Sequence, residues 1–294
     1  MAVEKQKVKT FDMVDARAIK AIKGTSFLIY NASGARKTRT LGTIPNGNFT
    51  LHISFDSGSS SATSAADLLG ITEAEHKVTV PQSLQEFGEI INALLAHPAY
   101  NAKIDNIVID NLVIITSLIQ SFVATSPKYA KDALHISDAF ADDTDKNPQG
   151  SKTLAYYNDV QRVTRELVFQ ILQLTDSYNV FLLAGEVQTT DKDGAPIVTV
   201  AINGPKSINP VVSMFSEVYR TSFKQTEFDS ADKIVTKFKI DTYTDTLTGM
   251  KYFGKTRNIK DVNKLTSGEM VADFREIFKE IGYVAKKDRV KVVA

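Results

Sequence analysis

The chain has 294 residues, with 35 basic and 34 acidic residues and 43% hydrophobic residues. This composition excludes a disordered polymer, and the length allows one large folded domain or two small ones. Cysteine is absent, which excludes disulfides, thiol catalysis and cysteine-based metal sites, and the four histidines lack metal-ligand spacing to one another. No apolar run reaches membrane-spanning length and no apolar leader opens the chain, so we expect a cytoplasmic protein with no membrane partner.

The charge is unevenly distributed along the chain. Residues 1–50 carry a net charge of +6 and residues 224–294 a net charge of +4, so residues 51–223 carry −9. The basic ends favour weak binding of polyanions there. We assign residues 1–23 to an N-terminal basic segment or helix and residues 24–294 to one folded domain.

Apolar runs of strand length alternate with segments of helical period, which predicts an α/β fold with a mostly parallel central sheet flanked by helices. In chain order, the predicted elements are strand Thr25–Tyr30, helix Lys37–Thr43, strand Phe49–Phe55, helix Ser83–Ala96, strand Asn106–Asp110, helix Leu112–Phe122, helix Thr153–Ser177, strand Asn179–Ala184 and helix Gly268–Gly282.

Three segments depart from this alternation. Residues 124–151 hold several Asp and Pro residues, and they predict a long surface excursion because the acidic cluster cannot be buried. Two β-rich segments, 196–202 and 214–223, are expected to form strands that pair with each other. Residues 234–260 predict a C-terminal β-hairpin, whose turn ends at Gly249 and uses the freedom of glycine to adopt a positive φ.

The turn after the first predicted strand is the segment most informative about function. Phosphate-binding loops follow the pattern G-x-x-x-x-G-K-[ST] between a strand and a helix. Lys37 and Thr38 have the correct spacing, whereas Asn31 and Arg36 occupy the two glycine positions. Asn tolerates left-handed backbone conformations, but the Arg36 Cβ would crowd a phosphate or reshape the loop. The candidate nucleotide-binding positions of this loop are Asn31, Ser33, Gly34, Ala35, Arg36, Lys37, Thr38 and Arg39.

A carboxylate, Asp110, follows the apolar strand segment Asn106–Asp110. In P-loop enzymes such a carboxylate holds Mg²⁺, directly or through water. The alternative is that Asp110 caps the next helix. The order strand, loop with Lys-Thr, then strand with Asp favours a P-loop fold, and both roles of Asp110 stay open.

The segments FLIY-NASGARKT, LHISFDSG, NIVIDNL, NVFLLAGEVQ and KYFGKTRN, in this order, resemble the phage RecA-like P-loop ATPases. The resemblance implies a RecA-like fold, ATP and Mg²⁺ as cofactors, and ATP binding with hydrolysis as the expected activity. It also implies self-assembly into a ring or filament that acts on single-stranded DNA in phage recombination, annealing or repair. The replaced glycines leave an alternative, a degenerate P-loop protein with a non-enzymatic scaffold or assembly role. A small-molecule kinase is less favoured, because residues 124–151 lack the arginines of a kinase lid.

The resemblance also implies roles for individual residues. Lys37 would neutralise the β and γ phosphates, and Thr38 and Asp110 would ligate Mg²⁺. Asp56 would activate the attacking water, although a simple turn residue is an alternative. Gln188, after the central strand, would sense the γ-phosphate, or it is a solvated loop residue.

Lys255 and Arg257 lie in a basic run, Lys251–Lys260, that contains no acidic residue. In RecA-like assemblies such residues contact phosphates of the neighbouring subunit, as an arginine finger does. Alternatively, the basic residues bind the backbone of single-stranded nucleic acid while Tyr252 and Phe253 stack on bases. A third interpretation is an ordinary solvated hairpin with an aromatic side chain packed in the core.

Overall fold

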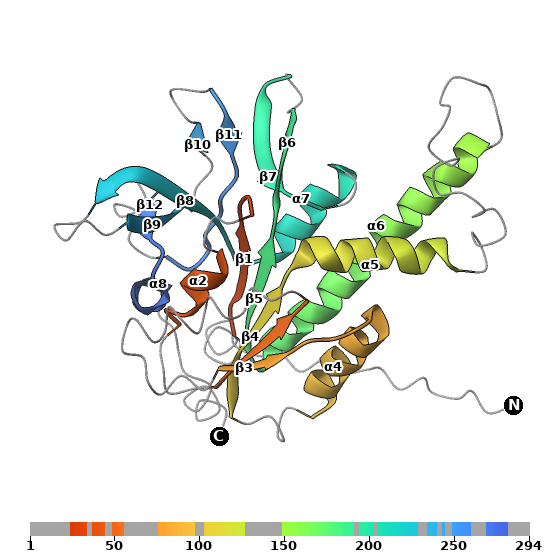
Figure 1. Ribbon diagram of the computed structural model, residues 1–294, viewed down its shortest axis with the longest axis horizontal. Helices are drawn as coiled ribbons and strands as arrows, with labels where there is room; N and C mark the ends of the chain where they lie inside the picture. The colour runs from red at the N-terminus through yellow and green to blue at the C-terminus, as the bar shows by residue number, and fades with distance from the viewer. Residues whose placement is uncertain are drawn as a thin grey trace, which may run out of the picture.

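A computed structural model of the protein describes residues 24–33, 37–44, 49–55, 76–97, 103–126, 149–190, 194–202, 205–228, 234–239, 243–244, 249–259 and 269–281 (Figure 1). The predicted N-terminal segment and most of the predicted surface excursion lie outside these residues. So do four candidate site residues, which are Gly34, Ala35, Arg36 and Asp56.

An eight-stranded sheet forms the centre of the fold, in the order β12-β9-β8-β1-β5-β4-β2-β3 (Figure 1). Its strands are β1 (Ser26–Tyr30), β2 (Phe49–Ser54), β3 (His76–Thr79), β4 (Ile104–Asp110), β5 (Asn179–Ala184), β8 (Glu217–Phe228), β9 (Ile234–Lys239) and β12 (Glu269–Val271). The pairings from β8 to β3 are all parallel, and only β9 pairs antiparallel, with β8 and β12. The predicted mostly parallel α/β sheet is confirmed.

The three inner strands β1, β5 and β4 are buried along their whole length. A parallel sheet covered on both faces needs apolar side chains on both faces of each strand, which explains the continuous apolar runs in the sequence. Phe27 of β1 stacks on Phe181 of β5, with 4.6 Å between ring centroids. These contacts fix the register of the strands whose ends carry the site.

Helices cover both faces of the sheet (Figure 1). One face carries α4 (Leu84–Ala96), α5 (Leu112–Ala124), α6 (Gln149–Gln173) and α7 (Pro205–Met214), and the other carries α2 (Lys37–Leu41) and α8 (Phe274–Ile281). Ser83 caps α4, since its side chain accepts a hydrogen bond from the Glu86 backbone N at 3.1 Å. None of the helices in the described part of the chain is both long and apolar enough to cross a membrane.

A second sheet, in the order β10-β11-β7-β6, lies beyond the carboxyl end of β5 (Figure 1). Its strands are β6 (Glu186–Thr190), β7 (Pro196–Val200), β10 (Tyr243–Thr244) and β11 (Lys251–Tyr252). Only Gly185 separates β5 from β6. A Cβ at Gly185 would lie 3.0 Å from Val113 Cγ2 and 3.4 Å from Ala201 Cβ, so the chain passes close to its neighbours at this joint.

The carboxyl-terminal half differs from the prediction in three places. Segments 196–202 and 214–223 belong to different sheets, because β7 pairs with β6 and β11 whereas β8 pairs with β1 and β9. The hairpin within 234–260 is shorter than predicted: β10 pairs antiparallel with β11, Gly249 has a φ of 66°, and β9 joins the main sheet instead. The predicted helix Gly268–Gly282 is wrong at its start, where β12 precedes α8.

Candidate functional site

The carboxyl ends of four parallel strands meet at one edge of the main sheet. Tyr30 of β1 pairs with Ala184 of β5, and Ser54 of β2 pairs with Asp110 of β4. Ligands of α/β proteins bind at this edge, where loops leave the strands. The predicted phosphate loop follows β1 directly, so it lies at the edge where a ligand is expected.

Thr38 and Asp110 are in direct contact, although 72 positions separate them in the sequence. The Thr38 hydroxyl, in the first turn of α2, donates a hydrogen bond to Asp110 Oδ2 at 2.8 Å. Asp110 is only 3% exposed. The structure thus brings together the two oxygen groups that the sequence assigned to Mg²⁺, a cation that prefers such ligands.

The alternative role of Asp110 as a helix cap is wrong. Asn111, the next residue, caps α5, because its side chain accepts a hydrogen bond from the Ile114 backbone N at 3.1 Å. The Asp110 carboxylate is therefore directed to Thr38 instead of to the helix.

His52 is a further neighbour of Asp110 that sequence reasoning missed. It lies on β2, fully buried, with its Nε2 3.7 Å from Asp110 Oδ2. The available signal was a histidine inside the apolar segment FTLHISF, on a strand whose end also reaches the site. A buried imidazole beside a carboxylate is one of the arrangements that orient a metal-binding group.

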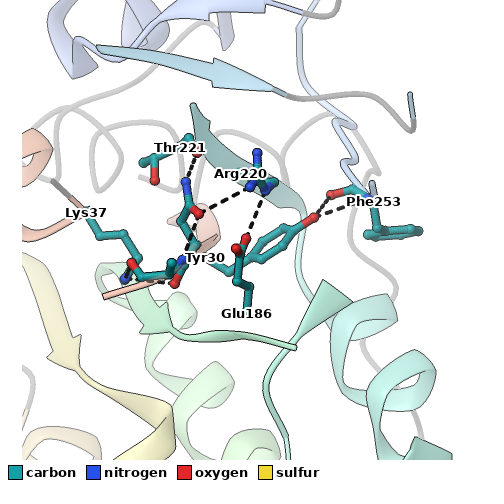
Figure 2. Close-up of polar contacts among 8 residues, drawn as sticks. Tyr30, Lys37, Glu186, Arg220, Thr221 and Phe253 are labelled. Atoms are coloured by element: carbon teal, nitrogen blue, oxygen red, sulfur yellow. Dashed lines mark hydrogen bonds and ion pairs between the residues drawn. The ribbon is translucent and has the colours of Figure 1, made fainter. Parts of the chain in front are cut away.

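Lys37 folds back over the phosphate loop (Figure 2). Its Nζ donates hydrogen bonds to the backbone O of Asn31 at 2.9 Å and of Ala32 at 2.7 Å. The ammonium group therefore lies at the start of the loop, at the carboxyl end of β1.

Asn31 is buried and fixed on the side of β8. Its Oδ1 accepts hydrogen bonds from the Ala32 backbone N at 2.7 Å and from Arg220 Nη2 at 3.3 Å. Its Nδ2 donates to the Thr221 backbone O (Figure 2). The residue at the first glycine position thus holds the loop by its side chain, a role that glycine could not fill.

Arg220 is the second residue of the site that sequence reasoning missed. Its Nε pairs with Glu186 Oε2 at 3.0 Å, and its guanidinium carbon lies 4.2 Å from the centroid of the Tyr252 ring. Beside it, the Tyr30 hydroxyl contacts both backbone polar groups of Phe253 (Figure 2). Arg220 is in register with Tyr30 on the neighbouring strand, and only this tertiary pairing brings it to the loop.

Three other predicted residues lie at the periphery. Ser33 and Arg39 are exposed, on the loop and on α2. Gln188 follows the central strand β5, which ends at Ala184 as predicted, and it lies exposed within β6. Its role as a γ-phosphate sensor stays a prediction.

Lys255 and Arg257 are attached to the carboxyl end of α7. Lys255 Nζ donates to the backbone O of Ser213 at 3.0 Å and of Phe215 at 2.7 Å, and Arg257 Nη2 donates to Ser213 O at 3.3 Å. Burial, followed by the charge of Arg257, lowers the pKa of Lys255. Phe253 packs against the core, as one interpretation of the basic run predicted. Within the single chain, both cations bind helix-end carbonyls.

In the main sheet β5 separates β1, whose end opens the loop, from β4, which carries Asp110, within the mostly parallel α/β arrangement predicted from the sequence. The sequence model of the family described as "AAA domain" matches residues 23–258. Among solved structures, the ATPase domain of a phage helicase is similar over 74% of this chain and 76% of that chain, with 10% sequence identity and a TM-score of 0.36. No curated protein matches the chain. The family match includes the loop, Asp110 and all four strands of the second sheet, and the chain belongs to the AAA domain family of P-loop ATPase domains.

Proposed function

We propose that this chain binds Mg-ATP at the loop after β1 and hydrolyses it. The observation that carries the proposal is the 2.8 Å contact between Thr38 and Asp110. The preceding residue, Lys37, directs its ammonium to the start of the same loop, at the Asn31 backbone O. The donor set fits the ligand, because hydroxyl and carboxylate oxygens suit Mg²⁺ and an ammonium suits the phosphates. Membership of the AAA domain family supports the same conclusion.

Each residue then has a defined task. Lys37 exchanges the carbonyl oxygens of Asn31 and Ala32 for phosphate oxygens, which are stronger acceptors for a cation. Thr38 and Asp110 would hold the metal; the Asp110 carboxylate is buried, and its Oδ2 already accepts the Thr38 hydrogen bond. Bound Mg²⁺ supplies neutralisation of the charge that develops on the phosphates.

The finer proposal is that ATP turnover serves a ring or filament acting on single-stranded DNA. The resemblance to phage RecA-like ATPases and the two basic ends of the chain support it. The second sheet lies beside the loop, and its strand β11 begins the basic run Lys251–Lys260, so this is the surface we expect to face DNA. The alternative, a scaffold without turnover, is supported by the replacement of both P-loop glycines, at Asn31 and Arg36.

ATP turnover measured with and without single-stranded DNA tests both parts. We expect turnover that DNA stimulates, and a loss of about a hundredfold in Lys37→Ala because the phosphates lose their cation. Lys279→Ala is the matched control, since Lys279 pairs with Glu276 at an exposed position of α8. ATP binding without turnover would favour the scaffold, turnover indifferent to DNA would reject the DNA role, and absence of ATP binding would reject the whole proposal.

A further inference from the structure

The Arg220 guanidinium lies where the phosphate loop, the main sheet and the second sheet meet (Figure 2). It contacts Glu186 at the start of β6, Tyr252 of β11 and the side chain of Asn31, which opens the loop. Only 14% of the Arg220 side chain is exposed, so solvent and salt screen these contacts weakly. One cation thus bridges the nucleotide-binding loop and two strands of the other sheet.

Asn31 is the residue through which Arg220 reaches the loop. Its side-chain Oδ1 accepts from Arg220, while its backbone O accepts from Lys37. A phosphate group attracts the Lys37 ammonium and so withdraws a hydrogen bond from the Asn31 backbone. Nucleotide binding therefore changes the bonding of a residue that Arg220 holds in place.

We infer that Arg220 is a positioning residue that couples nucleotide binding at the loop to the structure of the second sheet, acting through Asn31. The inference rests on the proposed function, because it requires nucleotide at this loop. Without the hydrogen bond from Arg220 to Asn31, the loop still has Lys37 and Thr38, but Asn31, its first residue, is no longer held in place by Arg220. The second sheet then no longer responds to nucleotide.

The chemistry of the link requires arginine. A guanidinium donates from separate nitrogens to Glu186 and Asn31 while its flat face lies on Tyr252. Lysine keeps the positive charge and can pair with Glu186, but its single nitrogen cannot serve all three partners. Arg220→Lys therefore breaks the link with little change in charge or burial.

The first measurement is a double-mutant cycle on the dissociation constant of Mg-ADP, followed with a fluorescent ADP analogue. We expect Arg220→Lys and Asn31→Ala each to weaken binding about fivefold, and the double variant to be no weaker than the weaker single variant. Arg162→Lys is the control, because Arg162 makes an exposed pair with Glu166 on α6. It should bind Mg-ADP like the wild type.

The second measurement is amide hydrogen exchange with and without Mg-ADP. In the wild type we expect nucleotide to slow exchange in the loop and also in β6 and β11. In Arg220→Lys at saturating Mg-ADP we expect the loop to remain protected while the protection of β6 and β11 disappears. A residue that only stabilised the fold would not separate the two responses.

The outcomes distinguish this inference from the proposed function. Arg220→Lys with wild-type affinity and wild-type exchange would overturn the coupling and leave nucleotide binding established. Effects that multiply in the double variant would overturn the action through Asn31. A wild-type protein that does not bind Mg-ADP would reject the proposed function and the coupling together.

Discussion

Glu217, a fully buried carboxylate of β8, fixes the basic segment beside the main sheet. Its Oε1 accepts hydrogen bonds from the backbone N of Arg257 at 3.2 Å and of Asn258 at 3.1 Å, and from Asn258 Nδ2 at 2.8 Å. Its Oε2 accepts from the Tyr219 hydroxyl at 2.8 Å. Buried charge is tolerated when it is hydrogen-bonded in this way, so Glu217 can hold Arg257 beside α7.

The Tyr219 hydroxyl gives a prediction about alkaline pH. Burial, and next the charge and hydrogen bond of Glu217, raise the pKa of Tyr219 well above its ordinary value. Above about pH 10 the unfolded chain releases this proton while the folded chain retains it, so stability falls as pH rises. We expect Tyr219→Phe to be less stable by about 1 kcal/mol at neutral pH, because Glu217 loses a donor. Urea unfolding from neutral pH to above pH 10 should show a shallower alkaline loss in the variant, and parallel curves would contradict this account.

At the scale of elements, two glycines predict opposite effects of the same substitution. Gly24 precedes β1, and a Cβ there would lie 1.8 Å from the Tyr178 backbone O. Gly88 lies within α4, where a Cβ would meet nothing within 4 Å. We expect Gly24→Ala to destabilise the protein by about 2–4 kcal/mol. Gly88→Ala serves as the matched control and should stabilise it by about 0.5–1 kcal/mol, since alanine favours helix. Equal shifts in the urea midpoint of the two variants would refute the conclusion that the Tyr178 backbone leaves no room for a Cβ at Gly24.

The sequence alone was sufficient for the inner strands and for the Thr38–Asp110 pair. The buried strands β1, β4 and β5 are continuous apolar runs, because both of their faces are covered. Asp110 was identifiable because a carboxylate ending such a run must lie at the ligand-binding edge. Thr38 followed from the spacing to Lys37, so local pattern was enough for both partners.

The second sheet and Arg220 could not be predicted in this way. β6 is half exposed and polar, with the sequence EVQTT, so it has the pattern of a loop. The start of α8 depends on a distant contact, because Thr43 Oγ1 accepts a hydrogen bond from the Phe274 backbone N at 2.8 Å. Arg220 reaches Asn31 only because β1 pairs with β8. The contact between Asn31 and Thr221, the residue after Arg220, joins positions that are 190 apart in the sequence. Such long-range pairings leave no periodic signal in the sequence.

At the scale of the whole molecule, a net charge of +1 is composed of basic ends and an acidic middle. The Lys37 ammonium and the Asp110 carboxylate belong to opposite regions of this distribution, yet both lie at the same edge of the sheet. A confined phosphate site is therefore compatible with near neutrality, whereas extensive coating of DNA is not.

For the single-stranded DNA binding that we propose, this charge balance predicts a shallow salt dependence. If each protomer contacts about three to five phosphates, the logarithmic slope of affinity against salt should be about −2 to −3.5. Fluorescence anisotropy of a labelled oligo(dT) over a range of salt concentrations measures this slope. A slope near about −7, corresponding to some ten phosphates, would show that a much larger basic surface is used.

The joint at Gly185 has a mechanical consequence for the molecule. With a single residue between β5 and β6, the second sheet is a covalent continuation of a central strand. The Gly185 carbonyl also accepts a hydrogen bond from the Ala201 backbone N at 2.9 Å, which ties the start of β6 to the end of β7. A pull on the second sheet is therefore carried along β5 into the middle of the main sheet, between the strand of the phosphate loop and the strand of Asp110. A force on the second sheet would therefore act on β1 and β4 together, because both strands pair with β5.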